Sequence, residues 1–97
     1  MEAMKKVEIV VDSVFLNRVL EVLEKAGVSG YTVIKDALGK GERGIMAGDE
    51  LTDVFKNSYI FTVCTKEVAD KIVQGVGPIL KRAGGICILS DVLWLSH

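Results

Sequence analysis

The order in which strand-like and helix-like patterns follow one another most constrains the fold of this 97-residue sequence. Four short apolar runs are typical of strands, and two stretches repeat apolar residues at helical spacing. The resulting order, strand, helix, strand, strand, helix, strand, is that of the ferredoxin-like α+β fold. We therefore predict a single domain over residues 1–97, with a four-stranded antiparallel sheet and two helices on one face. The predicted strands cover residues 6–11, 31–35, 56–65 and 86–90, and the first helix covers about 14–26.

Local signals mark the ends of the predicted helices. Asp12 and Ser13 can cap the first helix, and Gly27 can end it. Thr65 can cap the second helix. These residue types satisfy backbone groups that have no partner within a helix.

The second helix meets two glycines and the chain's one proline near its end, at Gly75, Gly77 and Pro78. Proline removes a backbone donor and disfavours the α conformation of the residue before it. We therefore expect this helix to stop or kink there, with a further turn over residues 79–83. Residues 92–97 are expected to form a tail after the fourth strand.

The first and third predicted strands are apolar on both faces. Val10 lies opposite Val7 and Ile9, and Ile60 lies opposite Tyr59 and its neighbours. Strands of this kind are buried on both sides. Because both helices cover the same face, we expect a homo-oligomer in which the uncovered sheet faces turn inward.

The same topology separates the two cysteines. It places the first strand between the third and fourth, so Cys64 and Cys87 lie two strand spacings apart, about 9.6 Å. That distance is larger than a disulfide tolerates. We expect both thiols to stay reduced.

The long connection between the second and third strands is the candidate functional segment. Residues 35–55 read KDALGKGERGIMAGDELTDVF, with no apolar period that would bury them. A connection of this length in a small domain is usually functional or disordered. Its glycines let backbone amides approach an anion, and its cations supply charge-assisted donors. A solvated loop that binds nothing explains the same composition. The residues that favour an anion site are Gly39, Lys40, Gly41 and Arg43.

Composition excludes several classes of function. The chain is 49% hydrophobic and 26% charged with a net charge of −1, which argues against disorder and against wholesale nucleic-acid binding. No run approaches a membrane span, so we expect a cytoplasmic protein that is not membrane-embedded. Two cysteines without CxxC spacing and a single histidine, His97, leave too few ligands for zinc. We therefore assign no metal. The loop string GKGERG matches the dinucleotide fingerprint GxGxxG, but it lacks the βαβ context that such a site needs.

The sequence resembles the PII signalling superfamily over almost its whole length. The likeness rests on GYTV at residues 30–33, the long loop at about 36–56, called the T-loop in that superfamily, and the glycine pair before the fourth strand. GYTV followed by GKGERG is most similar to the PII-like branch linked to inorganic carbon. That branch includes the carboxysome-associated PII-like protein and the PII-like partner of a bicarbonate transporter.

The resemblance implies a homotrimer that binds an adenine nucleotide in each intersubunit cleft and bicarbonate at the T-loop root. ADP or AMP is the expected ligand, with ATP and cyclic AMP as further candidates. Bicarbonate would lie at Gly39, Lys40, Gly41 and Arg43. The implied nucleotide-binding residues are Gly30, Tyr31, Thr32, Lys40, Arg43, Lys81, Arg82, Gly84 and Gly85.

The implied function is that of a sensor without catalytic activity, which reports energy and carbon status to a protein such as an inorganic-carbon transporter. Carboxysome association is part of this expectation. Two alternatives stay open, a nucleotide hydrolase that uses Lys40 and Arg43, and a nitrogen-type PII regulator of a transporter. Against the second, residues 36–56 contain no tyrosine that uridylylation could modify. A metal-handling trimer of the divalent-cation-tolerance type would need more histidine and cysteine.

Overall fold

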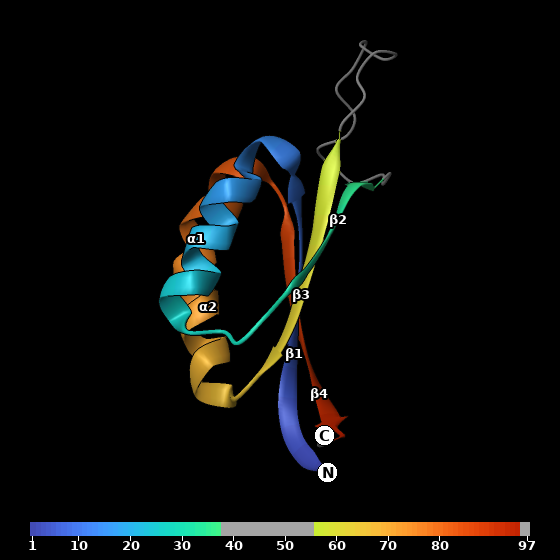
Figure 1. The fold of residues 1–97 in the computed structure, drawn as a ribbon. Coiled ribbons are helices and arrows are strands. Elements are labelled where there is room, and N and C mark those ends of the chain that lie inside the picture. Colours follow the sequence, from blue (N-terminus) through green and yellow to red (C-terminus); the bar gives the residue numbers. More distant parts are fainter. Residues whose placement is uncertain (38–55, 96–97) are drawn as a thin grey trace.

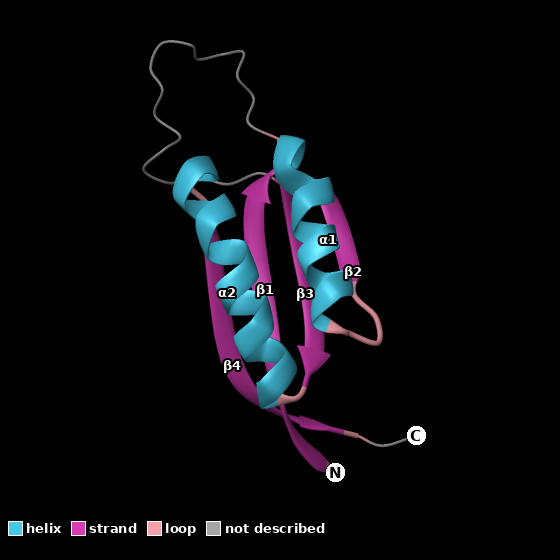
Figure 2. Ribbon diagram, turned by 90° about the vertical axis from the view of Figure 1, so that its left-hand side faces the viewer, coloured by secondary structure: helices cyan, strands magenta, loops and turns pink. Residues whose placement is uncertain are grey.

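The computed structural model describes residues 1–37 and 56–95 and places two helices on one face of a four-stranded antiparallel sheet (Figures 1 and 2). The strand order β2-β3-β1-β4 puts β1 between β3 and β4. The predicted α+β ferredoxin-like fold is therefore confirmed. The elements are β1 (Glu2–Asp12), the 3-10 turn η1 (Ser13–Phe15), α1 (Leu16–Ala26), β2 (Thr32–Ala37), β3 (Asn57–Cys64), α2 (Lys66–Ala83) and β4 (Ile86–Trp94).

The hydrophobic core lies between the sheet and the two helices. Alternate residues of β1, namely Val7, Ile9 and Val11, are at most 1% exposed, because they point from the central strand toward the helices. Leu23 of α1 and Ile72 of α2 cover them from the other side and are fully buried. The helix stripes that predicted amphipathic helices are thus the surfaces that close the core.

The predicted caps are present. The Asp12 carboxylate accepts a hydrogen bond of 3.0 Å from the backbone N–H of Val14. Thr65 Oγ1 accepts one of 3.3 Å from the backbone N–H of Val68. Gly27 ends α1 in the left-handed conformation, with φ of 89°. The first turn is a 3-10 turn, so α1 itself begins at Leu16, two residues later than predicted.

The expectation that the second helix would stop near Pro78 is wrong. α2 runs without a break from Lys66 to Ala83 and includes Pro78. The residue before Pro78 is Gly77, which has no Cβ to clash with the proline ring, so it can stay helical. Val76 and Ala83 on either side are both buried, and that burial offsets the lost backbone hydrogen bond.

The expectation of a C-terminal tail is also wrong for residues 92–94, which belong to β4. Trp94 pairs with Glu2, and Val92 pairs with Met4, so β1 and β4 are both longer than predicted. The two strands extend past the helices as a ribbon near the chain termini (Figure 1). These residues are strands because they pair with each other, a contact across most of the sequence that leaves no local pattern.

The topology also separates the cysteines as predicted. Cys64 pairs with Lys5 on one side of β1, whereas Cys87 pairs with Ile9 on the other. Both thiols are free, and burial raises the pKa of each. A raised pKa keeps a thiol protonated and unreactive near neutral pH.

Candidate functional site

The C-terminal end of α2 brings two cations and two glycines to one end of the sheet. Lys81 and Arg82 are exposed in the last turn. Neither forms an ion pair with any carboxylate in residues 1–37 and 56–95. Cations in the last turn of a helix interact favourably with the helix dipole. Because these two side chains are exposed and have no ion-pair partner in this part of the chain, they can also bind an anion.

The glycine pair that follows has two separate geometric causes. Gly84 has a φ of 77° and ends α2, with its N–H donating to Leu80 O at 2.7 Å. Gly85 instead lies against β1, where an added Cβ would come within 2.3 Å of Val10 O. The chain therefore turns from α2 into β4 at a point where a larger residue does not fit.

β2 ends and β3 begins at this same end of the sheet (Figure 1), so the anchors of the connection between them lie here. Its two anchors are described: Ala37 pairs with Asn57, and the backbone N–H of Ser13 donates to Lys56 O at 2.8 Å. The register of β2 shifts between Ile34 and Ala37, where Asp36 adopts a φ of 59°. Such bulges bend a strand and redirect the chain that follows. The predicted ligands Gly39, Lys40, Gly41 and Arg43 lie outside the described residues.

The other predicted nucleotide residues lie at the start of β2. Gly30, Tyr31 and Thr32 are all exposed, and the space around Gly30 is open within 4 Å of an added Cβ. Thr62 Oγ1 donates a hydrogen bond of 2.6 Å to Gly30 O, which fixes the chain as it turns from α1 into β2. This arrangement leaves an aromatic ring and a hydroxyl facing outward at the edge of the sheet.

A single subunit does not bring the two predicted groups together. β2 forms one edge of the sheet and β4 the other. Three strand spacings, roughly 14 Å, therefore separate Thr32 from the start of β4 across the sheet. Thr32 pairs with Phe61, whereas Ile86, the residue after Gly85, pairs with Val10. One subunit therefore holds the two predicted groups on opposite edges of its sheet.

A polar cluster on the sheet face away from the helices was not predicted from the sequence. The Tyr59 hydroxyl donates a hydrogen bond of 2.7 Å to Glu8, and Lys6 Nζ lies 4.0 Å from the same carboxylate. Lys6 Nζ also lies 4.9 Å from the centre of the Phe61 ring. The hydrogen bond to Glu8, burial and the carboxylate charge together raise the pKa of Tyr59. Glu8 and Tyr59 are 51 positions apart, so no local motif marks them.

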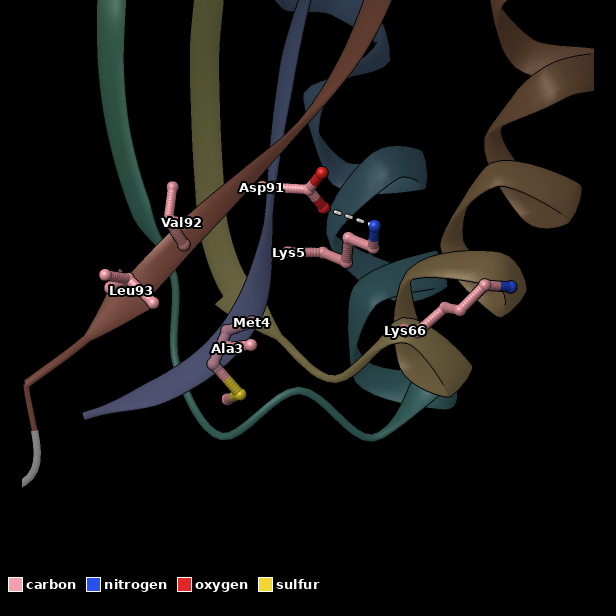
Figure 3. Close-up of a pocket in the computed structure, with 7 residues that line it drawn as sticks. All are labelled: Ala3, Met4, Lys5, Lys66, Asp91, Val92 and Leu93. Atoms are coloured by element: carbon pink, nitrogen blue, oxygen red, sulfur yellow. Dashed lines mark hydrogen bonds and ion pairs between the residues drawn. The ribbon is translucent and has the colours of Figure 1, made fainter.

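A cavity of about 410 Å³ lies at the opposite end of the molecule from the segment's anchors (Figures 1 and 3). It opens where the β1–β4 ribbon passes the start of α2. Lys5 and Asp91 form an ion pair across the two strands there, and the Lys66 side chain points away from that pair (Figure 3). No sequence pattern indicated this cavity, because its strands were predicted too short. Its lining residues are Ala3, Met4, Lys5, Lys66, Asp91, Val92 and Leu93.

Two general features of the described chain bear on function. Within residues 1–37 and 56–95, no three or more histidine, cysteine, aspartate or glutamate side chains group as metal ligands. In the same part of the chain, no helix is both long and apolar enough to span a membrane.

The fold is that of a ferredoxin-like subunit in which a long connection joins β2 to β3. Both strands reach that connection at the end of the sheet where α2 ends. The chain belongs to the nitrogen regulatory protein P-II family, whose model matches residues 4–96. No curated protein matches the sequence significantly.

Solved structures of PII-like proteins share the fold. One is CPII, a nitrogen regulatory PII-like protein from Thiomonas intermedia, bound to ADP, AMP and bicarbonate. It has a TM-score of 0.82 and 21% identity, over 99% of this chain and 97% of that chain. CPII bound to ADP and bicarbonate gives 0.79 and 26%, over 94% and 87%. A PII-like signalling protein from Thermus thermophilus gives 0.73 and 28%, over 93% and 87%. These likenesses support the PII-like branch.

Proposed function

We propose that this P-II family member is a signalling protein that binds ADP or AMP in clefts between the subunits of a homotrimer. Bicarbonate binds beside the phosphates, at Gly39, Lys40, Gly41 and Arg43. The ligands change the state of the T-loop, which reports energy and inorganic-carbon status to a partner protein such as a transporter. The protein does not catalyse a reaction on the nucleotide.

The observation that carries this proposal is the family match over residues 4–96, together with a relative at 26% identity whose structure holds ADP and bicarbonate. The geometry of this chain supports it in two ways. Lys81 and Arg82 are exposed without ion-pair partners among the described residues, at the same end of the sheet as the anchors of the T-loop. The β2 group and the β4 group lie on opposite edges of one sheet, which favours a site shared between subunits over one within a single subunit.

Calorimetric titration with AMP, ADP, ATP and cyclic AMP, each with and without bicarbonate, tests the ligand assignment. We expect ADP or AMP to bind most tightly and bicarbonate to tighten that binding. Linkage then requires the nucleotide to tighten bicarbonate by the same factor. ADP dissociation constants that are equal with and without bicarbonate, at matched pH and ionic strength, would remove bicarbonate from the proposal.

The role of the α2 cations is tested separately. Arg82→Ala removes charge-assisted hydrogen bonds worth about 1.5–3 kcal/mol. ADP binding should therefore weaken roughly ten- to a hundredfold. Lys71→Ala is the matched control, because Lys71 is an exposed cation on the same helix, about three turns before Arg82. Equal affinity in the two variants would exclude Arg82 from the phosphate site.

The nucleotide hydrolase alternative predicts a product. After incubation of the purified chain with ATP, chromatography should recover ATP unchanged if the protein is a sensor. Conversion to ADP that disappears in Arg82→Ala would favour the hydrolase instead.

A further inference from the structure

The connection between α1 and β2 has little of its own to hold it in place. Val28 and Val33, at its two ends, pack against the hydrophobic core. The residues between them, 29–32, are all exposed, so they contribute no buried side chain. Among residues 1–37 and 56–95, the only side-chain hydrogen bond that reaches them comes from Thr62, whose Oγ1 donates to Gly30 O at 2.6 Å.

Thr62 makes this bond from inside the core. It is 2% exposed and lies on the face of β3 that also carries Ile60 and Cys64, both buried. A hydroxyl among such neighbours needs a hydrogen-bond partner, because burying it without one is costly. The partner is the carbonyl of Gly30, an exposed residue whose position the bond therefore restricts.

We propose that Thr62 is a positioning residue for the nucleotide site, because its hydroxyl holds Gly30, Tyr31 and Thr32 in the place where they meet ADP. The inference rests on the proposed function, in which the start of β2 contacts the nucleotide. It adds to that site a residue that does not touch the ligand. A segment already held in its bound conformation does not have to be ordered by the ligand, so binding is tighter.

The register between β2 and β3 shows that Thr62 can act only indirectly. Thr32 pairs with Phe61, the residue before Thr62. Successive side chains of a strand point to opposite faces, so Thr62 points toward the helices and Phe61 toward the other side of the sheet. A ligand at the exposed start of β2 does not reach the buried Thr62 hydroxyl, and any effect of this hydroxyl on binding passes through Gly30.

Replacement of Thr62 tests the role of the hydroxyl. Thr62→Val keeps the shape of the side chain and removes the hydrogen bond, so ADP binding measured by calorimetry should weaken roughly two- to tenfold. Thr62→Ser keeps the hydroxyl and should bind ADP as the unmodified chain does. Thr65→Ala is the matched control, because it removes a threonine hydroxyl that accepts from Val68 N–H on α2, outside the predicted nucleotide residues. It should leave ADP affinity unchanged.

Double-mutant cycles show where Thr62 acts. Thr62→Val and Thr32→Val alter the same segment, so their effects on ADP affinity should not add. Thr62→Val and Arg82→Ala alter groups on opposite edges of the sheet, so their fold-changes should multiply. A residue that merely stabilised the fold would not distinguish the two cycles.

Hydrogen exchange gives a local measurement without any nucleotide. The backbone amides of residues 28–32 should exchange faster in Thr62→Val than in the unmodified chain, while the amides of β1 keep their protection. Far-UV circular dichroism checks that each variant folds. If the valine variant does not fold, Thr62→Ala removes the same hydroxyl and takes its place in every comparison.

Three results would overturn the inference: equal ADP affinity in Thr62→Val and the unmodified chain, a serine variant as weak as the valine variant, or additive effects of Thr62→Val and Thr32→Val. An unmodified chain that binds no ADP would contradict the proposed function and remove this inference with it. Normal ADP binding by the unmodified chain together with any of the three results overturns the inference alone.

Discussion

Gly85 shows how one residue joins the fold to the candidate site. It lies between the cations of α2 and the first residue of β4, and an added Cβ would meet Val10 O at 2.3 Å and Leu80 Cδ2 at 3.1 Å. The nearest atom belongs to the backbone of the central strand, which cannot move without shifting its hydrogen bonds to both neighbours. A larger residue would thus push β4 and the end of α2 away from β1.

Gly85→Ala should lower the free energy of unfolding by about 1–3 kcal/mol, the usual range for a group forced into a packed site. Urea denaturation followed by circular dichroism measures the change. Ser90→Ala, at an exposed position of the same strand, should stay within about 0.5 kcal/mol of the unmodified chain. Equal free energies of unfolding for Gly85→Ala and Ser90→Ala would contradict the close approach of Gly85 to the Val10 carbonyl oxygen.

Tyr59 makes stability depend on alkaline pH. Its pKa is raised above the ordinary value of 10.0, first by the hydrogen bond to Glu8. Because the pKa of Tyr59 is higher in the folded than in the unfolded chain, its hydroxyl contributes its full stabilisation below about pH 10. This stabilisation is lost as the pH rises through the pKa of Tyr59 in the folded chain.

Unfolding midpoints measured from neutral pH to above about pH 10 should therefore fall more steeply for the unmodified chain than for Tyr59→Phe. The variant lacks the hydroxyl and should differ most near neutral pH. Parallel curves over the whole range would show that the pKa of Tyr59 is the same in the folded and the unfolded chain.

At the scale of secondary-structure elements, sequence patterns identified the helices and strands whose formation depends on residues close together in the sequence. The strict alternation of β3, the stripes of both helices and the caps at Asp12 and Thr65 all identified their elements correctly. The pattern failed where a neighbour decides: Gly77 lets α2 continue through Pro78, and residues 2–5 and 91–94 become strand only by pairing with each other. Pairing over that sequence distance leaves no periodic signal.

The candidate site was predictable to a similar degree. The residues at the start of β2 and the end of α2 follow from resemblance to PII proteins, and the sheet order places them on opposite edges. The Glu8–Tyr59 contact was not predictable, because it depends on the register between β1 and β3. The T-loop residues Lys40 and Arg43 lie outside the described chain and stay predictions.

The Thr65 cap gives a direct test of how α2 starts. Thr65→Ala removes the acceptor for the Val68 N–H and should lower the free energy of unfolding by about 1 kcal/mol. Thr65→Ser keeps a hydroxyl at the same place and should retain most of that stability. Chemical denaturation of both variants measures the difference. A serine variant as unstable as the alanine variant would assign the loss to the methyl group's packing.

At the scale of the whole molecule, two features bear on the proposed homotrimer. One is the sheet face away from the helices, where Ile34, Ile86 and Ile88 are exposed, and the other is the division of the candidate nucleotide residues between β2 and the α2–β4 turn. When one edge of each copy contacts the other edge of the next copy, the copies form a closed ring if the rotation between neighbours adds up to a full turn. In such a ring every interface joins the β2 edge of one copy to the β4 side of the next.

Subunit mixing with ADP titration tests this central claim most directly. One variant carries Thr32→Val at the β2 edge, and the other carries Arg82→Ala. We predict that each binds ADP weakly alone, and that co-refolded mixtures regain normal affinity at about one site in four, where two intact groups meet. Mixtures that bind no better than the separate variants would contradict a nucleotide site shared between subunits.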